Sequence, residues 1–216
     1  MKIEDVQQLI NQNKDLILSK SLLNCHVRGL HSFILKQDED GNLIRMFVTD
    51  ETHELGRNYC PKDPKDWEIL SVAIHPHHVD IQINMIFGQI RNVEFTLTKP
   101  ETFYAQKRLR KYIWQSQIVN GQGGFKQVGK SVLYLKNRKV LKEGSSTKMN
   151  SCELHTVHVW EKQVAAWIIV ESEESCGYDN VNYSNDDLES WTANGLYQKP
   201  TPEQITTILG SINLIF

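Results

Sequence analysis

Hydrophobic and polar residues repeat with a helical period at the two ends of the chain. Within the segment 1–22, aliphatic side chains recur at roughly helical spacing among Gln, Asn and Lys, which predicts an amphipathic helix over residues 3–20. Near the other end, Thr201 precedes a Pro and is followed by Gln204, a pattern typical of a capped helix start. The short helix that begins there is expected to end near Gly210.

Between residues 27 and 171 the pattern changes to short apolar runs separated by polar turn clusters. The first two runs flank the polar residues 38–42 and so predict a β-hairpin. The candidate strands cover residues 30–35, 43–48, 68–74, 79–87, 92–98, 112–119, 132–135, 154–160 and 164–171. Their number and spacing predict a β-barrel or β-sandwich core over residues 27–171. Residues 172–216 form a C-terminal extension that contains the short helix.

Length and composition are those of a globular protein. The 216 residues are 40% hydrophobic and 23% charged, which suits one sizeable core, so a single domain over residues 1–216 is expected. A net charge of −2 provides no global field to attract nucleic acid or an anionic membrane surface. The longest nearly apolar stretch, residues 164–170, is far shorter than the ~20 residues of a membrane span. The N-terminus does not resemble a signal peptide, so a cytoplasmic location is expected.

The candidate chemistry lies in unevenly distributed histidines. Alternate side chains of an extended strand share a face, so His75 and His77 can point toward one metal ion. His155 lies in a later apolar run, and a sheet that closes on itself can bring that run to the same interior point. Three neutral ligands would leave coordination positions open, as in a catalytic metal site. His78 and His158 stay open as replacements for one of these ligands, and a polar strand edge beside a structural His155 is the competing interpretation.

This spacing resembles that of a known family. The segment Ile74-His75-Pro76-His77, followed by Gln82 and Gly88, resembles the first motif of the cupin superfamily, in which H-x-H precedes a Glu and then a Gly. Gln82 stands at the Glu position, and His155 resembles the His of the second cupin motif. The resemblance covers about 100 residues, over 68–171. It implies a mainly β fold, a cupin-type double-stranded β-helix (jelly-roll barrel), with flanking N- and C-terminal helices.

Cupins without the motif Glu resemble the thiol dioxygenases of the cysteine dioxygenase type, whose iron is held by three His. The resemblance implies that His75, His77 and His155 hold Fe(II) or another divalent metal. Arg45 stands where that family has the Arg that grips the substrate carboxylate, a role suited to a planar guanidinium. Tyr178 is the stand-in for the family's catalytic Tyr. The expected function is a non-haem Fe(II) dioxygenase acting on a small acidic substrate, for which a thiol is one option.

Two other functions remain open. His78 and Asp80 form an H-x-D pair that could join His155 or His158 in the two-His, one-carboxylate set of the 2-oxoglutarate-dependent oxygenases. Lys162 is the nearby basic residue for the co-substrate in that case. The alternative from another class is a non-catalytic barrel that binds a metal or a small molecule, since fold does not fix function.

Strand alternation also predicts which side chains surround the metal. Gln82, Asn84 and Ile86 share one face, and Gln82 and Asn84 are expected to line a substrate pocket with Arg45. The alternate residues of the same strand would then face outward, and an apolar outward face suggests a homodimer. These residues are Ile83, Met85 and Phe87. The partners expected are a small-molecule substrate and a second copy of the chain, with no nucleic acid and no membrane.

Overall fold

The computed structural model describes the chain except for residues 56–72, 103–105, 120–121, 176–179, 186 and 190–194, and it describes only the backbone of residues 116–119, 122–123 and 173–175. The helices are α1 (Ile3–Gln12), α2 (Lys14–Lys20) and α3 (Pro202–Gly210). The strands are β1 (Leu30–Gln37), β2 (Leu43–Thr49), β3 (Val79–Phe87), β4 (Gln89–Thr96), β5 (Gln106–Val119), β6 (Gln122–Lys142), β7 (Ser146–Met149), β8 (Leu154–His158), β9 (Ala166–Ser175) and β10 (Val181–Ser184). None of the described helices is long and apolar enough to cross a membrane.

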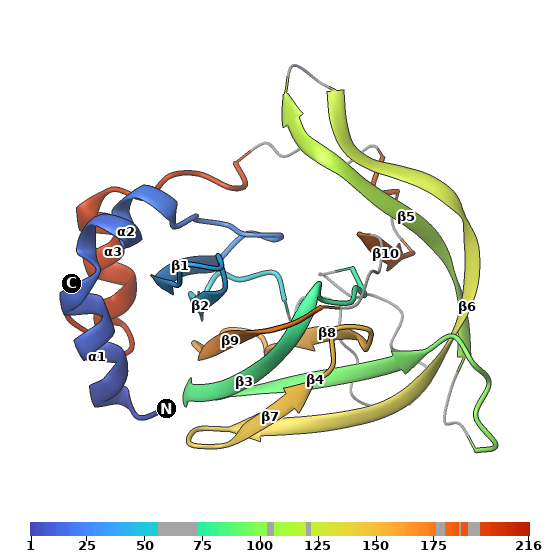
Figure 1. The fold of residues 1–216 in the computed structure, drawn as a ribbon, viewed down its shortest axis with the longest axis horizontal. Coiled ribbons are helices and arrows are strands. Elements are labelled where there is room, and N and C mark those ends of the chain that lie inside the picture. The colour runs from blue at the N-terminus through green and yellow to red at the C-terminus, as the bar shows by residue number, and fades with distance from the viewer. Residues whose placement is uncertain (56–72, 103–105, 120–121, 176–179, 186, 190–194) are drawn as a thin grey trace.

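Two five-stranded antiparallel sheets form the body of the molecule. One has the order β1-β2-β9-β3-β7 and the other the order β10-β5-β6-β4-β8. Both sheets therefore combine strands from distant parts of the chain, as in a jelly roll. Figure 1 shows the curled sheets facing one another, with the helices gathered beside β1 and β2 at one side. The prediction of a mainly β, cupin-type jelly-roll barrel with helices at both ends of the chain is confirmed.

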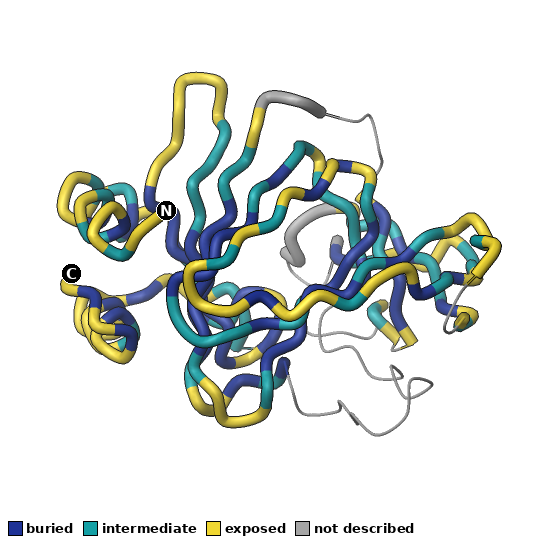
Figure 2. Tube along the Cα trace, turned by 90° about the horizontal axis from the view of Figure 1, so that it is seen from below, coloured by how far each residue is buried: buried dark blue, intermediate teal, exposed yellow. Residues whose placement is uncertain are grey.

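The sheet that contains β9 is buried on both faces. Its outer face packs under the helices, where Ile168 of β9 and Met46 of β2 share a cluster with Ile10 of α1 and Leu209 of α3. Its inner face contributes Trp167 to a second cluster inside the barrel. In Figure 2 these central strands are mostly dark blue, whereas the helices are yellow on the side away from the sheet. Burial of both faces makes this sheet the rigid wall on which the inner side chains are mounted.

Several predicted elements differ from the observed ones. The N-terminal helix is two helices, because Asn13 leaves the helical conformation with φ −128° and its side-chain amide donates to the Leu9 carbonyl at 2.9 Å. Strands β5 and β6 are longer than predicted, and β7 and β10 were not predicted. The barrel thus continues past residue 171, since β10 pairs with β5. The strand predicted over residues 68–74 lies almost wholly outside the described residues.

The facing of β3 is the reverse of the prediction. Ile83 and Met85 are 0% and 1% exposed and belong to the core inside the barrel. Gln82 and Asn84 lie on the outer face, where the Gln82 amide donates to Asn84 Oδ1 at 2.9 Å. The prediction failed because both faces of this strand are buried, so alternation alone does not tell inside from outside. Ile83 and Met85 therefore do not form the outward apolar face from which a homodimer was inferred, and the homodimer itself stays a prediction.

Candidate metal centre and pocket

Three histidines meet where a short segment before β3 pairs with β8. The backbone N–H of His75 donates to the carbonyl of His155 at 3.1 Å, and the N–H of His155 donates to the carbonyl of His75 at 3.1 Å. The N–H of His77 donates to Ser151, just ahead of β8, at 3.0 Å. These main-chain bonds set the two segments in fixed register, and extended backbone directs both imidazoles of the H-x-H pair to one side.

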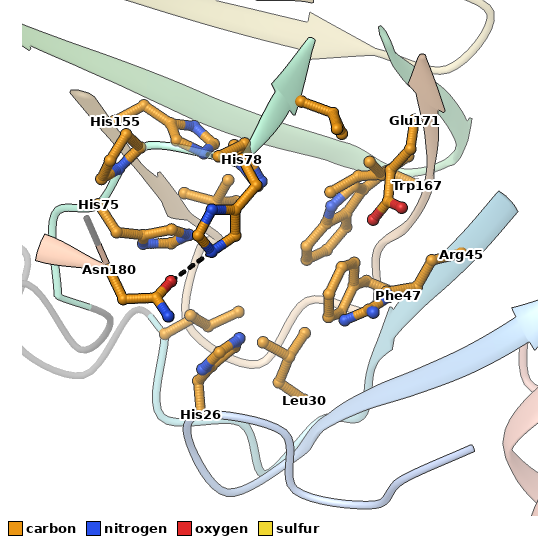
Figure 3. Close-up of a pocket in the computed structure, with 16 residues that line it drawn as sticks. His26, Leu30, Arg45, Phe47, His75, His78, His155, Trp167, Glu171 and Asn180 are labelled. Carbon is orange, nitrogen blue, oxygen red and sulfur yellow. Dashed lines mark hydrogen bonds between the residues drawn. The ribbon is translucent and has the colours of Figure 1, made fainter. Parts of the chain in front are cut away.

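The three imidazoles converge on one point, as the sequence predicts. His77 Nε2 and His155 Nε2 are 2.8 Å apart, and the ring centroid of His75 lies 5.2 Å from that of His77 and 5.4 Å from that of His155. One ring nitrogen from each residue lies within 4.8 Å of the other two, close enough for all three to hold a single metal ion. Figure 3 shows His75 and His155 on the same side of the cavity.

Hydrogen bonds at the far side of two rings fix the nitrogens that face the centre. His155 Nδ1 donates to Asn92 Oδ1 at 2.7 Å, and His75 Nδ1 donates to the Ala73 carbonyl at 2.8 Å. The amide nitrogen of Asn92 donates to Glu94 Oε1 at 3.2 Å, which holds its oxygen toward His155. With the proton on Nδ1, each of the two rings presents an Nε2 lone pair to the centre, the arrangement common in protein metal sites.

Burial keeps these imidazoles neutral. It lowers the pKa of His75, and together with the charges of His75 and Arg45 it lowers the pKa of His77 to about 3. Burial also lowers the pKa of His155 well below its ordinary value, and the neighbouring His77 and His75 add to that effect. At neutral pH the lone pairs are therefore available for a metal ion, because no proton has to be removed first.

The histidine cluster opens into a cavity of about 340 Å³ between the two sheets. Its lining is largely apolar, with a few polar groups around the histidines and on the opposite wall, as is typical of small-molecule sites. Arg45 of β2, the predicted carboxylate ligand, lies in this lining. The other lining residues are His26, Leu30, Phe47, Leu55, His75, Pro76, His77, His78, Val79, His155, Val157, Trp167, Ile169, Glu171 and Asn180.

The remaining predicted site residues are placed elsewhere. Gln82 is not in the cavity lining, because it lies on the outer face of β3, and Tyr178 lies outside the described residues. His78 lines the rim and is hydrogen-bonded to Asn180, whereas Asp80 Oδ1 accepts the Ser151 N–H at 2.7 Å. Among the described residues, only the trio of His75, His77 and His155 forms a group that could hold a metal, so the H-x-D pair is not assembled with it.

His158 also stays apart from the three-histidine group. It is buried at 4% exposure, one residue beyond Val157, which faces the cavity, and so points to the other side of β8. Lys162 is exposed in the turn before β9 and does not line the cavity.

Sequence reasoning missed several residues of the cavity. His26 is reached through a loop in which it adopts φ +70°, and its Nδ1 bonds the Tyr197 hydroxyl at 3.1 Å. No spacing signal marks it. Trp167 and Glu171 do have a signal, because they alternate with Ile169 along β9 and therefore share the inner face. Asn92 behind His155 has none, since its role depends on the pairing of β4 with β8.

Comparisons with known proteins give no close relative. No family model matches the sequence, and no curated protein matches it. Among solved structures, hydroxypropylphosphonic acid epoxidase from S. wedmorenis matches with a TM-score of 0.38 and 10% identity, over 72% of this chain and 56% of the epoxidase chain. The Drosophila melanogaster CENP-C cupin domain matches with a TM-score of 0.37 and 13% identity, over 79% of this chain and 97% of that domain.

Hydroquinone 1,2-dioxygenase from Sphingomonas sp. TTNP3 matches with a TM-score of 0.33 and 10% identity, over 78% of this chain and 73% of that chain. Likenesses this distant say nothing about activity. The strand order and the three-histidine group define the class on their own: a cupin-type barrel with a candidate metal centre in its interior.

Proposed function

We propose that this chain is a non-haem Fe(II) dioxygenase that acts on a small acidic substrate, with a thiol acid as the first to test. The observation that carries the proposal is the convergence of His75, His77 and His155 at one end of a cavity that also contains Arg45. A ligand set with no carboxylate and three imidazoles suits Fe, Zn, Cu or Ni rather than Mg or Ca. Three protein ligands leave positions for substrate and oxygen.

Each side chain has a defined task in this proposal. His75, His77 and His155 would hold the ion, which when bound supplies the oxygen chemistry that protein side chains lack. Arg45 would bind the substrate carboxylate, because it lines the cavity and forms no ion pair with a described carboxylate. The apolar lining excludes water and strengthens that ion pair, so a substrate held by Arg45 is oriented relative to the three histidines.

Oxygen consumption tests the proposal. The Fe(II)-loaded protein should consume O₂ when cysteine or another small thiol acid is added, at a rate above that of free iron. Arg45→Gln should raise KM for the acidic substrate by about tenfold or more, because a charge-assisted hydrogen bond is lost. Arg28→Gln is the matched control, since Arg28 is exposed and lies outside the cavity.

Two outcomes would contradict the proposal. Uptake that requires added 2-oxoglutarate would assign the chemistry to another ligand set, with His78 and Asp80 as its candidates. Tight metal binding without uptake on any small acid, thiol acids included, would favour a non-catalytic barrel.

The residue behind His155 should tune the metal affinity. Asn92 is 0% exposed and accepts the Nδ1 proton of His155, so Asn92→Ala leaves that N–H without a partner and frees the ring to rotate. A loss of about 10–100-fold in affinity for Co(II) or Zn(II) is expected, measured by competition with a chromophoric chelator. Asn84→Ala is the control, because Asn84 is also buried but lies on the outer face of β3. Equal metal affinities in the two variants would show that Asn92 does not position His155.

A further inference from the structure

The wall opposite the histidines carries an ordered series of groups along β2 and β9. Phe47 lies opposite Trp167, Arg45 opposite Ile169, and Glu171 follows two residues further on the same face. Glu171 is held in place because its Oε2 accepts the Leu43 N–H at 3.0 Å. Residues two apart on a strand are separated by about 6.6 Å, so the series from Trp167 to Glu171 spans about 13 Å. Figure 3 shows this wall across the cavity from His75 and His155.

The two charges on this wall have no protein partner of opposite sign. Within the described part of the chain, neither Arg45 nor Glu171 forms an ion pair, although both line the cavity and are partly buried. Arg45 Nε is buried without an acceptor. Charges held in a largely apolar cavity are costly unless a counter-charge reaches them. A ligand with an anion at Arg45 and a cation at Glu171 would compensate both.

The aromatic part of the wall consists of two stacked rings and includes a buried N–H group. The rings of Phe47 and Trp167 are stacked, with centroids 5.5 Å apart and 22° between planes, and the side chains are 7% and 2% exposed. Trp167 Nε1 is buried and has no acceptor among the described residues. A flat apolar group would pack against the stacked rings.

The size of the cavity narrows the ligand further. A volume of about 340 Å³ lies at the lower end of the range found for small-molecule sites. A three-carbon thiol acid would leave more of this space to solvent than an amino acid with a six-membered ring.

We propose that the cavity binds a zwitterionic ligand with a flat apolar body, in chemical class an aromatic α-amino acid. Its carboxylate lies at Arg45, its ammonium at Glu171, and its ring against Phe47 and Trp167. This inference rests on the proposed function, because it takes the three histidines to hold a metal ion. That ion would face the aromatic ring of the ligand. The substrate is then larger than a small thiol acid, and its carboxylate and ammonium groups lie on the wall opposite the three histidines.

Calorimetric titration with matched ligands tests the inference. The full-length protein, saturated with redox-inert Zn(II) and also as isolated, is titrated with phenylalanine, 3-phenylpropionate, phenethylamine and cysteine. Phenylalanine should bind tightest, and loss of the ammonium or of the carboxylate should weaken binding by about tenfold or more. The inference is overturned if 3-phenylpropionate binds as tightly as phenylalanine, or if cysteine binds tighter than both.

A single variant assigns the ammonium site. Glu171→Gln removes the charge but keeps an oxygen that accepts the Leu43 N–H. The affinity for phenylalanine should therefore fall to that for 3-phenylpropionate, whereas the affinity for 3-phenylpropionate should not change. Glu161→Gln removes the same charge from an exposed turn and should change neither. An equal loss for both ligands in Glu171→Gln would contradict the assignment.

The titrations separate the two proposals. One outcome is that the protein binds all matched ligands with the same affinity and still binds metal and consumes O₂ with a thiol acid. In that case only the amino-acid inference is overturned. Selective phenylalanine binding in a protein that binds no metal overturns the proposed function and leaves the ligand class standing.

Discussion

Replacing His155 with alanine should lower the affinity for a divalent metal by more than about 100-fold, a larger loss than removal of an outer hydrogen-bond partner causes. The variant removes one of three imidazoles whose ring nitrogens lie within 4.8 Å of one another. It also leaves Asn92 Oδ1 without the N–H that it accepts. Competition of Co(II) or Zn(II) with a chromophoric chelator measures the loss directly.

His158→Ala is the matched control for this experiment. Both histidines lie on β8 and are buried, at 2% and 4% exposure, but His158 is not in the three-histidine group. The two variants should therefore lose comparable packing, whereas only His155→Ala should lose metal. A folded His155→Ala protein with wild-type metal affinity would exclude this metal centre.

The protein should become markedly less stable as the pH falls below 6.5. Burial, with the charges of nearby groups, lowers the pKa of His77 to about 3 and that of His158, which is 4% exposed, to about 4. Between these values and the ordinary pKa, the unfolded chain binds protons that the folded chain does not, so the free energy of unfolding decreases as the pH decreases. At pH 4.5 the expected loss is about 2–3 kcal/mol for each of the two residues.

Urea unfolding at pH 7.5 and pH 4.5 measures this loss, with a chelator present so that metal binding makes no contribution. His158→Gln cannot titrate, and it should reduce the difference between the two pH values by about 2–3 kcal/mol. A free energy of unfolding that is the same at both pH values would show that these histidines are not held neutral by the fold.

The sequence predicts those features that depend on local spacing. The H-x-H pair of His75 and His77 specifies two ligands on one face, and β3 was predicted with the observed bounds, Val79–Phe87. The capped start of α3 was also predicted, because Thr201 and Gln204 exchange their hydrogen bonds within four residues. In each case the interacting groups are neighbours in the chain, so the pattern itself contains the contact.

Apart from the placement of His155, features that depend on pairing between distant strands could not be predicted. Alternation places Gln82 and Asn84 on one face of β3, but it does not tell which face is inside. Both faces pack against apolar clusters, one inside the barrel and one under the helices. Glu171 meets the start of β2 only because β2 and β9 are paired across more than 120 residues of sequence. Such strand registers are set by the packing of the whole sheet, so they cannot be predicted from the spacing of residues in one sequence.

The main-chain bridge between His75 and His155 also bears on how the protein is made. The two residues are separated by 80 positions, and each donates its backbone N–H to the carbonyl of the other. During synthesis, a chain on the ribosome holds His75 and His77 long before His155 has emerged. Assembly of the three-histidine group therefore has to follow the closing of the barrel, and a prematurely terminated chain that ends before β8 would leave the translation machinery without the third histidine.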